Sequence, residues 1–378
     1  MISRDLLTAL RERIFTGKAL VVLGARQTGK STLIKQLLAE RTERILWLNA
    51  DNELTRQNLE IQNIEALRTL IGKNQIVVID EAQRIKNVGL TLKLITDQLP
   101  EKQLIVTGSS ALELTNQINE PLTGRKWEYK LYPISWQELV EYTDPAVAQM
   151  QLHQRLIFGM YPEVVTNIGD EIERLNMLID SYLYKDVLSF GNIRKPTVLK
   201  KLLQALALQL GSEVSLNELS QLLQIDKNTV DTYLDLLEKA FVIFRLQPLS
   251  RNLRNEVSSS RKIYFYDNGV RNALISNFNM PDLRTDIGAL WENFLISERL
   301  KSNHYQRRYA QTYFWRTKTQ QEIDWVEDEN GQLSAFEFKW KANKVVKCPS
   351  QFREAYTTAT FEVITPANMA SFLLNALD

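Results

Sequence analysis

The eight residues Gly24-Ala-Arg-Gln-Thr-Gly-Lys-Ser31 have the residue types and the spacing of a phosphate-binding loop (P-loop). Two glycines allow the backbone to turn so that several N–H groups face one anion, and a following helix N-terminus adds positive partial charge. The Lys30 ammonium would reach the β- and γ-phosphates of a nucleotide, and the Ser31 hydroxyl would ligate Mg²⁺. The residues expected to contact the nucleotide are Gly24, Ala25, Arg26, Gln27, Thr28, Gly29, Lys30, Ser31 and Thr32.

An acidic pair, Asp80-Glu81, directly follows the apolar run Ile76-Val-Val-Ile79. Such a run is typical of a central parallel strand, and ligands bind at the carboxyl ends of those strands. Asp80 is therefore the candidate for holding Mg²⁺, and Glu81 for orienting or deprotonating the attacking water. A further strand end carries a small polar residue that could sense the γ-phosphate, and both Thr107 and Ser109 qualify.

Transfer of a γ-phosphoryl group also needs positive charge near its equatorial oxygens, and a neighbouring subunit can supply it. Arg125, in the turn Pro121-Leu-Thr-Gly-Arg125-Lys126, is the candidate for this arginine, in cis or in trans. The alternative is an ordinary arginine of a surface turn. A role in trans would require a homo-oligomer.

Alternating strands and helices must position these residues. Apolar runs at 19–23, 45–48, 76–79 and 103–107 read as strands, and residues 1–14 and 32–38 have helical spacing. This alternation predicts the α/β class, with a doubly wound parallel sheet and helices on both faces.

Composition limits the remaining possibilities. A chain of 378 residues is long enough for two or three domains, and 46 Lys+Arg against 45 Asp+Glu give no global sign of a nucleic-acid partner. Cys348 stands alone, which excludes a disulfide within the chain. Only His153 and His304 could supply imidazole and no Cys/His cluster occurs, which argues against a structural zinc site. The charged N-terminus and the short apolar runs predict a cytoplasmic location and no membrane partner.

The chain resembles the predicted AAA+ superfamily P-loop ATPases of bacteria and archaea, which carry a C-terminal domain of unknown function. The motifs behind the resemblance are the P-loop, Asp80-Glu81, Thr107-Gly-Ser-Ser110, Leu122-Thr-Gly-Arg125, Tyr132-Pro-Ile-Ser-Trp-Gln-Glu-Leu139, Phe158-Gly-Met-Tyr-Pro-Glu163, Tyr182-Leu-Tyr-Lys-Asp186 and residues 229–340. The resemblance implies ATP and Mg²⁺ as cofactors and an AAA+-type ATPase activity. ATP is also favoured over GTP because no Asn-Lys-x-Asp motif occurs.

The middle of the chain predicts helices over 145–210 and then two helices, 215–223 and 227–239, joined by a short turn. A hairpin of 241–246 and 262–266 would complete a winged helix-turn-helix. The wing has a local charge of +4, from Arg245, Arg251, Arg254, Arg261 and Lys262 against Glu256. It is a candidate DNA contact, whereas the acidic second helix favours packing between domains instead.

The last part of the chain is similar to the core of PD-(D/E)XK nucleases. A helix at 287–300 carries Glu292, and a hairpin turned by Glu329-Asn-Gly331 carries Asp324 on one strand and Glu337 and Lys339 on the other. The similarity implies that Asp324 and Glu337 hold Mg²⁺, that Glu292 assists, and that Lys339 activates the water or stabilises developing charge. The sequence departs from the motif by having Glu322-Ile-Asp324 where the motif name has Pro-Asp. The basic tract Lys339-Trp-Lys341-Ala-Asn-Lys344-Val-Val-Lys347 is compatible with a nucleic-acid surface.

Four domains follow from these patterns. They are a P-loop AAA+-type ATPase domain (1–142), a helical lid or connector (143–210), a winged-helix-like module (211–284) and a small α/β nuclease-like domain (285–378). The predicted function is ATP hydrolysis that drives or gates action on a macromolecular partner, with DNA as the expected partner and a protein as the other candidate. The alternatives are an ATP-gated DNA nuclease and a nucleotide-controlled binding switch with little turnover.

Overall fold

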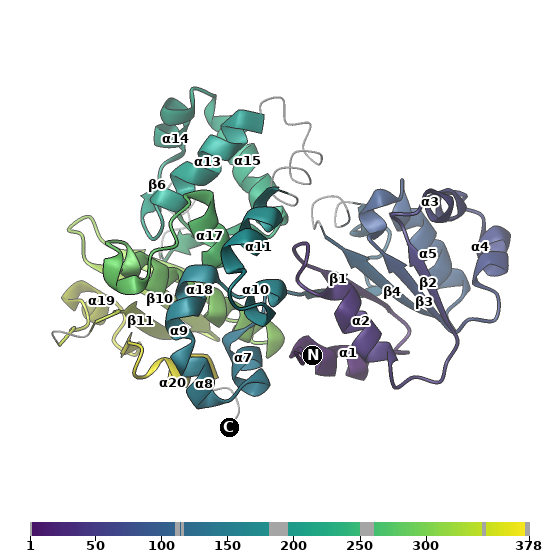
Figure 1. Ribbon diagram of the computed structural model, residues 1–378, viewed down its shortest axis with the longest axis horizontal. Helices are drawn as coiled ribbons and strands as arrows, with labels where there is room; N and C mark the ends of the chain where they lie inside the picture. Colours follow the sequence, from purple (N-terminus) through teal and green to yellow (C-terminus); the bar gives the residue numbers. More distant parts are fainter. Residues whose placement is uncertain are drawn as a thin grey trace. The chain divides into compact units, whose positions relative to one another are not determined.

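A five-stranded parallel sheet lies at the centre of the amino-terminal part of the chain (Figure 1). Its strands, in spatial order, are β2 (Ile45–Asn49), β3 (Ile76–Asp80), β4 (Gln103–Gly108), β1 (Ala19–Leu23) and β5 (Lys126–Lys130). The three inner strands are buried along their whole length, as their apolar runs predict. Because β4 lies between β1 and β3, the residues that follow these three strands come together at one edge of the sheet.

The helices of this region pack in two groups. The first contains α1 (Leu6–Arg13) and α2 (Lys30–Leu38), and the second contains α3 (Glu53–Glu60), α4 (Ile64–Ile71) and α5 (Val88–Gln98). A short helical turn, η1 (Ala82–Arg84), follows β3. The predicted α/β class is thereby confirmed.

The computed structural model describes residues 2–109, 114, 117–180, 196–249, 261–341 and 345–374. The predicted residues Asp186, Arg251, Arg254 and Lys344 lie outside this part of the chain. The chain forms two compact units: Met1–Ile134 with Lys239–Phe241, and Ser135–Glu238 with Val242–Asp378.

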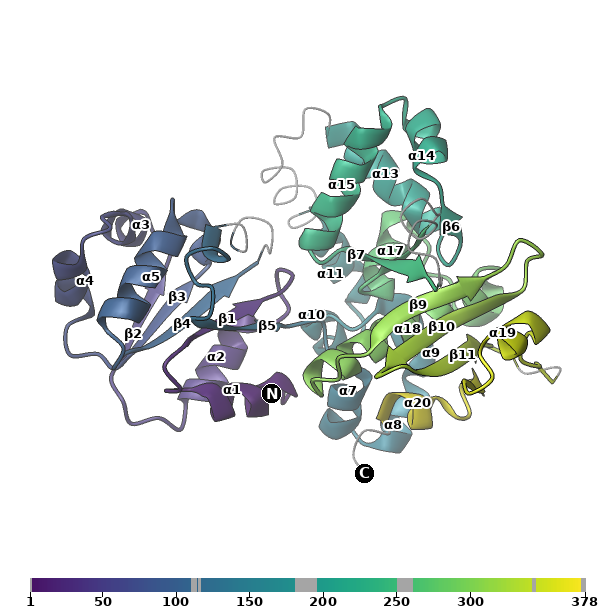
Figure 2. The ribbon, with the colours of Figure 1, turned by 180° about the vertical axis from the view of Figure 1, so that it is seen from behind.

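The second unit contains a seven-stranded mixed sheet (Figure 2). Its strands, in spatial order, are β12 (Thr360–Ile364), β11 (Gln332–Phe338), β10 (Glu322–Glu329), β9 (Gln311–Arg316), β7 (Ile243–Pro248), β8 (Arg261–Phe265) and β6 (Glu213–Val214). The parallel pairing of Gln247 and Pro248 with Tyr313 and Phe314 joins β7 to β9. Strands from both sides of residue 284, the predicted boundary between two modules, therefore belong to one sheet.

The helices described in the second unit are α7 (Trp136–Tyr142), α8 (Pro145–Met150), α9 (Leu152–Phe158), α10 (Pro162–Thr166), α11 (Glu171–Leu178), α13 (Pro196–Leu208), α14 (Leu216–Leu223), α15 (Lys227–Lys239), α17 (Asn268–Leu274), α18 (Ile287–Tyr305), α19 (Ser350–Ala355) and α20 (Met369–Leu374), together with the short turn η3 (Pro281–Leu283). Helix α18 contacts β8 and β11. In the part of the chain that the structure describes, no helix combines the length and the apolar character needed to cross a membrane.

Residues 159–161 separate α9 from α10, which begins at Pro162. Gly159 has a φ of +74°, and a Cβ atom placed there would lie 2.1 Å from Asp267 Oδ1. Only glycine combines that backbone conformation with so close an approach. The glycine therefore allows the Asp267 carboxylate to accept a hydrogen bond from the Met160 N–H, at 2.6 Å.

Candidate functional site

The P-loop connects β1 to α2 and has the conformation of an anion-binding turn. Gln27 and Gly29 both have positive φ, 61° and 93°, which turns successive N–H groups toward one side. A Cβ atom on Gly24 would lie 2.1 Å from the Leu131 carbonyl oxygen, so the loop needs glycine here to pack against the segment after β5. The buried Lys30 Nζ donates to the carbonyl oxygens of Gly24 and Ala25, each at 2.9 Å, and thus lies across the loop.

The structure brings Ser31 and Asp80 together, as a shared Mg²⁺ site requires. Ser31 Oγ donates to Asp80 Oδ2 at 2.9 Å, and Thr107 Oγ1 donates to the other carboxylate oxygen. A serine hydroxyl and a carboxylate are oxygen ligands of the kind that Mg²⁺ prefers, with water completing its coordination shell. The residues present therefore fit Mg²⁺, which Ser31 and Asp80 would hold.

Glu81 lies beside Asp80 and is held by two side chains. Its Oε2 atom accepts hydrogen bonds from Ser109 Oγ at 2.8 Å and from Gln83 Nε2 at 2.6 Å. Burial raises the pKa of Glu81, but the Lys30 charge, the hydrogen bonds from Gln83 and Ser109 and the charge of Arg26 together lower this pKa below its ordinary value. Glu81 is therefore a carboxylate at neutral pH, which is the form a general base needs.

The structure assigns separate contacts to the two polar residues at the end of β4. Thr107 Oγ1 contacts Asp80 and also accepts the Glu81 N–H at 3.2 Å, whereas Ser109 contacts the Glu81 side chain. Both therefore belong to the site: Thr107 contacts the candidate metal-binding carboxylate, and Ser109 contacts the candidate base.

Two residues of the site were not identified from the sequence. Gln83 donates to both Glu81 and Ser109, and among the residues that the structure describes its buried Oε1 has no hydrogen-bond partner. The other residue is the buried Arg4, from the segment 1–14 that has helical spacing. Its guanidinium donates to the carbonyl oxygens of Thr28 and Tyr132, each at 2.7 Å. No local motif marks either residue, because their roles depend on contacts between segments far apart in the chain.

Arg125 lies at the amino ends of the strands, whereas the P-loop lies at their carboxyl ends. Strands β1 and β5 are parallel, and the Ala19 N–H donates to the Arg125 carbonyl oxygen at the amino end of both. The five residues of β1 separate Arg125 from the P-loop, a span of roughly 16 Å at the usual rise per residue. Its guanidinium pairs with Asp97 at 2.5 Å. Arg125 does not reach the P-loop of its own subunit.

The four residues of the nuclease-like prediction do lie together. Lys339 Nζ donates to Glu337 Oε1 at 2.6 Å, and Asp324 Oδ2 accepts the Phe338 N–H at 2.8 Å. Burial and then the Glu292 charge raise the pKa of Asp324 to about 7, and burial and then the Asp324 charge raise the pKa of Glu337 to about 7. Asp324 also lies where the register between β9 and β10 shifts, a feature that often re-aims side chains.

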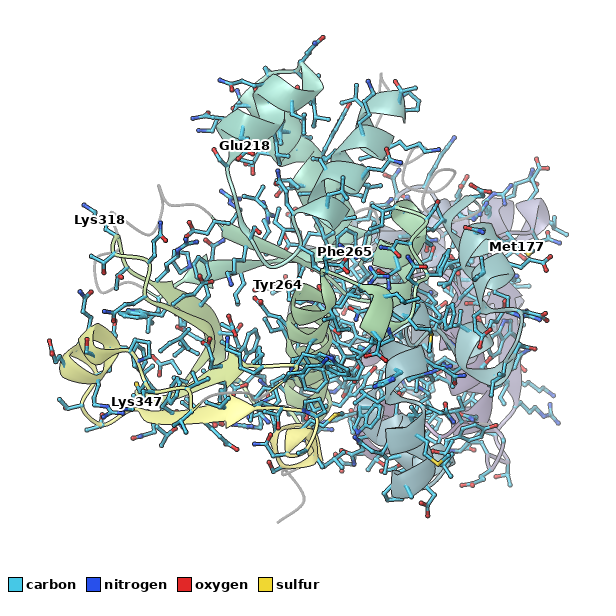
Figure 3. The ribbon with its side chains drawn as sticks, turned by 60° about the vertical axis from the view of Figure 1, so that its left-hand side comes forward. Met177, Glu218, Tyr264, Phe265, Lys318 and Lys347 are labelled. Carbon is cyan, nitrogen blue, oxygen red and sulfur yellow. The ribbon has the colours of Figure 1, made fainter. Side chains whose placement is uncertain are left out.

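A lysine from β8 enters this cluster. Lys262 Nζ lies 3.0 Å from Glu292 Oε1, 2.5 Å from Glu322 Oε1 and 4.0 Å from Asp324 Oδ1. Tyr264, two residues along the strand and labelled in Figure 3, donates to the same oxygen of Glu292 at 2.6 Å. Among the described residues, no three Asp, Glu, His or Cys side chains are arranged to hold a metal ion. The residues present at this cluster do not fit Mg²⁺, because the Lys262 ammonium group already binds Glu292 Oε1 and Glu322 Oε1 and lies close to Asp324 Oδ1.

The helices and the hairpin predicted over 215–266 are present as α14, α15, β7 and β8. The positive charges described in the hairpin are already paired. Arg245 contacts Glu238, Asp235 and Asp231, and Arg261 contacts Asp231. Since Lys262 is buried, the local charge of +4 does not form a free basic surface in the described part of this hairpin.

The carboxyl-terminal basic tract differs in part from the prediction. Trp340 is half-buried, because its ring packs 5.5 Å from the rings of both His153 and Trp291. Lys341 and Lys347 are exposed, and Figure 3 shows Lys347 at the surface.

Three family models match successive segments of the chain. Residues 16–140 match the family model of an AAA domain, residues 149–281 match a domain of unknown function (DUF8612), and residues 287–370 match a second one (DUF4143). Residues 16–140 thus have an AAA-type P-loop ATPase fold. The resemblance to P-loop ATPases with a C-terminal domain of unknown function is thereby confirmed, whereas no comparison links the carboxyl-terminal domain to nucleases.

Individual relatives and solved structures share little sequence identity with this chain. An uncharacterized protein of Mycobacterium tuberculosis is 26% identical over 345 residues, which cover 89% of this chain and 73% of that protein. An uncharacterized protein of Methanocaldococcus jannaschii is 22% identical over 357 residues, which cover 88% of this chain and 76% of that protein. The solved structure of a Walker-type ATPase of Pyrococcus abyssi is 17% identical, covers 73% of this chain and 96% of its own, and superposes with a TM-score of 0.49.

Proposed function

We propose that this protein binds ATP with Mg²⁺ at the P-loop and hydrolyses ATP there. The observation that carries the proposal is the meeting of three strand ends at one edge of the sheet. Lys30 lies across the P-loop, Asp80 accepts from Ser31, and Glu81 is held as a carboxylate beside them. A fold that only bound phosphate would not need a hydrogen-bonded carboxylate in this place.

Each residue then has a separate task. The backbone N–H groups of the P-loop and the Lys30 ammonium bind the β- and γ-phosphates. Glu81 orients the attacking water and accepts its proton, while Ser109 and Gln83 fix the direction of the Glu81 carboxylate. Bound Mg²⁺ would supply positive charge to the phosphate oxygens. The base is proposed to be adenine because residues 16–140 match the AAA model.

We further propose that the protein works as a homo-oligomer. Arg125 does not reach the P-loop of its own subunit, so it can stabilise a γ-phosphoryl group only across a subunit boundary. This proposal rests on the parallel register that places Arg125 at the amino end of β5. A rise of about tenfold or more in ATP turnover per chain as the protein concentration is increased would support it.

DNA is the proposed partner, and the cytoplasm is the proposed location. The exposed Lys341 and Lys347 support a contact with phosphate groups, whereas the ion-paired Arg245 and Arg261 do not. A protein partner is the alternative. We do not propose phosphodiester cleavage at Asp324 and Glu337, because Lys262 binds within their cluster.

The test is ATP turnover, measured without DNA and with single- and double-stranded DNA. Lys30→Ala should abolish hydrolysis, while the matched variant Lys35→Ala, on an exposed position of the same helix, should keep it. A DNA partner predicts faster turnover when DNA is added. Hydrolysis that survives in Lys30→Ala would refute the proposal. Tight ATP binding with negligible turnover, unchanged by Glu81→Gln, would establish the nucleotide-controlled switch instead.

A further inference from the structure

The carboxylate cluster of the second unit is organised around a lysine from outside the nuclease-like motif. Lys262 precedes that motif in the chain, on β8, and its side chain is 1% exposed. Glu292 comes from α18, and Glu322 and Asp324 come from β10. Three carboxylates from two elements thus surround one ammonium group from a third element.

The charge state of this lysine follows from its neighbours. Burial alone lowers the pKa of a lysine, but the charges of Glu292, Asp324 and Glu322 outweigh burial and raise the pKa of Lys262 above its ordinary value. The group is therefore an ammonium ion at neutral pH. It is a permanent cation, fixed by the chain, at the point where the carboxylates meet.

One oxygen of each carboxylate is bound by another group, whereas Glu337 Oε2 is buried and has no hydrogen-bond partner among the described residues. Glu292 Oε1 accepts from both Lys262 and Tyr264. Asp324 Oδ2 accepts the Phe338 N–H, and Glu337 Oε1 accepts from Lys339. A hard divalent cation needs several carboxylate oxygens at once, so an ion that bound Glu292 Oε1 and Glu322 Oε1 would have to displace the Lys262 ammonium group.

We infer that Lys262 is a built-in cation that replaces the divalent metal ion in this cluster, so that the carboxyl-terminal domain does not bind Mg²⁺ or Mn²⁺ there. The domain keeps the acidic residues of a metal-dependent nuclease core while its own lysine neutralises them. Removal of the Lys262 charge should then convert the cluster into a metal site. The inference does not depend on ATP hydrolysis.

The test is Mn²⁺ titration of the full-length, nucleotide-free protein, with free Mn²⁺ measured by electron paramagnetic resonance. Every protein compared carries Asp80→Asn, which removes the contribution of the P-loop site. In this background Lys262→Met should bind one additional Mn²⁺ ion per chain, and adding Asp324→Asn should abolish that binding. Lys262→Arg, which keeps the positive charge, should bind no additional ion.

Two results would overturn the inference. One is a folded Lys262→Met protein that binds no additional Mn²⁺. The other is a protein with Lys262 intact that loses a bound Mn²⁺ ion when Asp324 is changed to Asn. The second comparison contains no change at Lys262, so it decides the question even if Lys262→Met fails to fold.

Discussion

Ser109 Oγ donates a hydrogen bond of 2.8 Å to Glu81 Oε2, from the end of β4 to the residue that follows β3. Parallel pairing of these strands places the two residues at the same sheet edge, although 28 positions separate them in the chain. The hydrogen bond fixes the direction of the candidate base and favours its charged form.

Ser109→Ala should therefore lower kcat and move the acidic limb of the pH–rate profile to higher pH. Loss of a hydrogen bond to a charged group costs about 1.5–3 kcal/mol, or roughly a tenfold to hundredfold loss of rate. The sign of the pH change follows because this hydrogen bond lowers the pKa of Glu81, so that its removal raises that pKa. The measurement is steady-state ATP turnover from pH 5 to 9, with Ser110→Ala as the neighbouring control. An unchanged acidic limb in Ser109→Ala would contradict this role.

Arg4→Ala should weaken both nucleotide binding and the amino-terminal unit. The buried guanidinium connects the Thr28 and Tyr132 carbonyl oxygens, and its loss should cost about 2–3 kcal/mol of unfolding free energy. Arg11→Ala is the matched control, because its ion pair with Glu40 is exposed and should contribute less than about 1 kcal/mol. Urea unfolding and ATP binding are the measurements. Equal effects of the two substitutions would argue against a stabilising role for the two hydrogen bonds of Arg4.

The residues predicted from the sequence are those whose role depends on a local pattern. The P-loop, the Asp80-Glu81 pair and the strand end with Thr107 and Ser109 each combine an apolar run with the residues that follow it. The α/β class follows from the same alternation. These elements were predictable because a buried central strand can be recognised from its own run of apolar residues.

The remainder depends on pairing between distant segments. The position of Lys262 depends on which strands neighbour β8, and a local charge count assigned it to a basic wing. Arg245 was assigned to the same wing, yet its partners lie on α15. Arg125 follows the P-loop motif in sequence, but the parallel register of β5 places it at the other end of the sheet. None of these relationships is encoded in spacing along the chain.

Asp324→Asn should gain stability relative to the wild type as the pH rises from about 5 to about 8. Asp324 has an ordinary pKa of 3.8 and a pKa of about 7 in the folded protein, so the folded state binds a proton that the unfolded state has released. The stabilising contribution of that proton is complete below the unfolded pKa and is lost as the pH rises through the folded one. Asparagine does not titrate and has no such loss.

The difference should be on the order of 2 kcal/mol across this pH range. Urea unfolding of both proteins at several pH values measures it. Asp328→Asn, at a half-buried position near the end of β10, serves as the control for the loss of a less buried carboxylate in the same hairpin. A pH-independent difference between Asp324→Asn and the wild type would show that Asp324 is ionised throughout.

Arg245→Ala should destabilise the region of α15, and added salt should reduce the effect. The Arg245 side chain is 16% exposed and contacts Glu238, Asp235 and Asp231. Its removal leaves three neighbouring carboxylates without their shared partner, which should cost about 2–3 kcal/mol at low salt. Because these acids are 31–46% exposed, salt screens their mutual repulsion in the variant. The measurement is urea unfolding at low and high salt. If Arg245 instead contacted DNA, the substitution would weaken DNA binding strongly and leave unfolding unchanged.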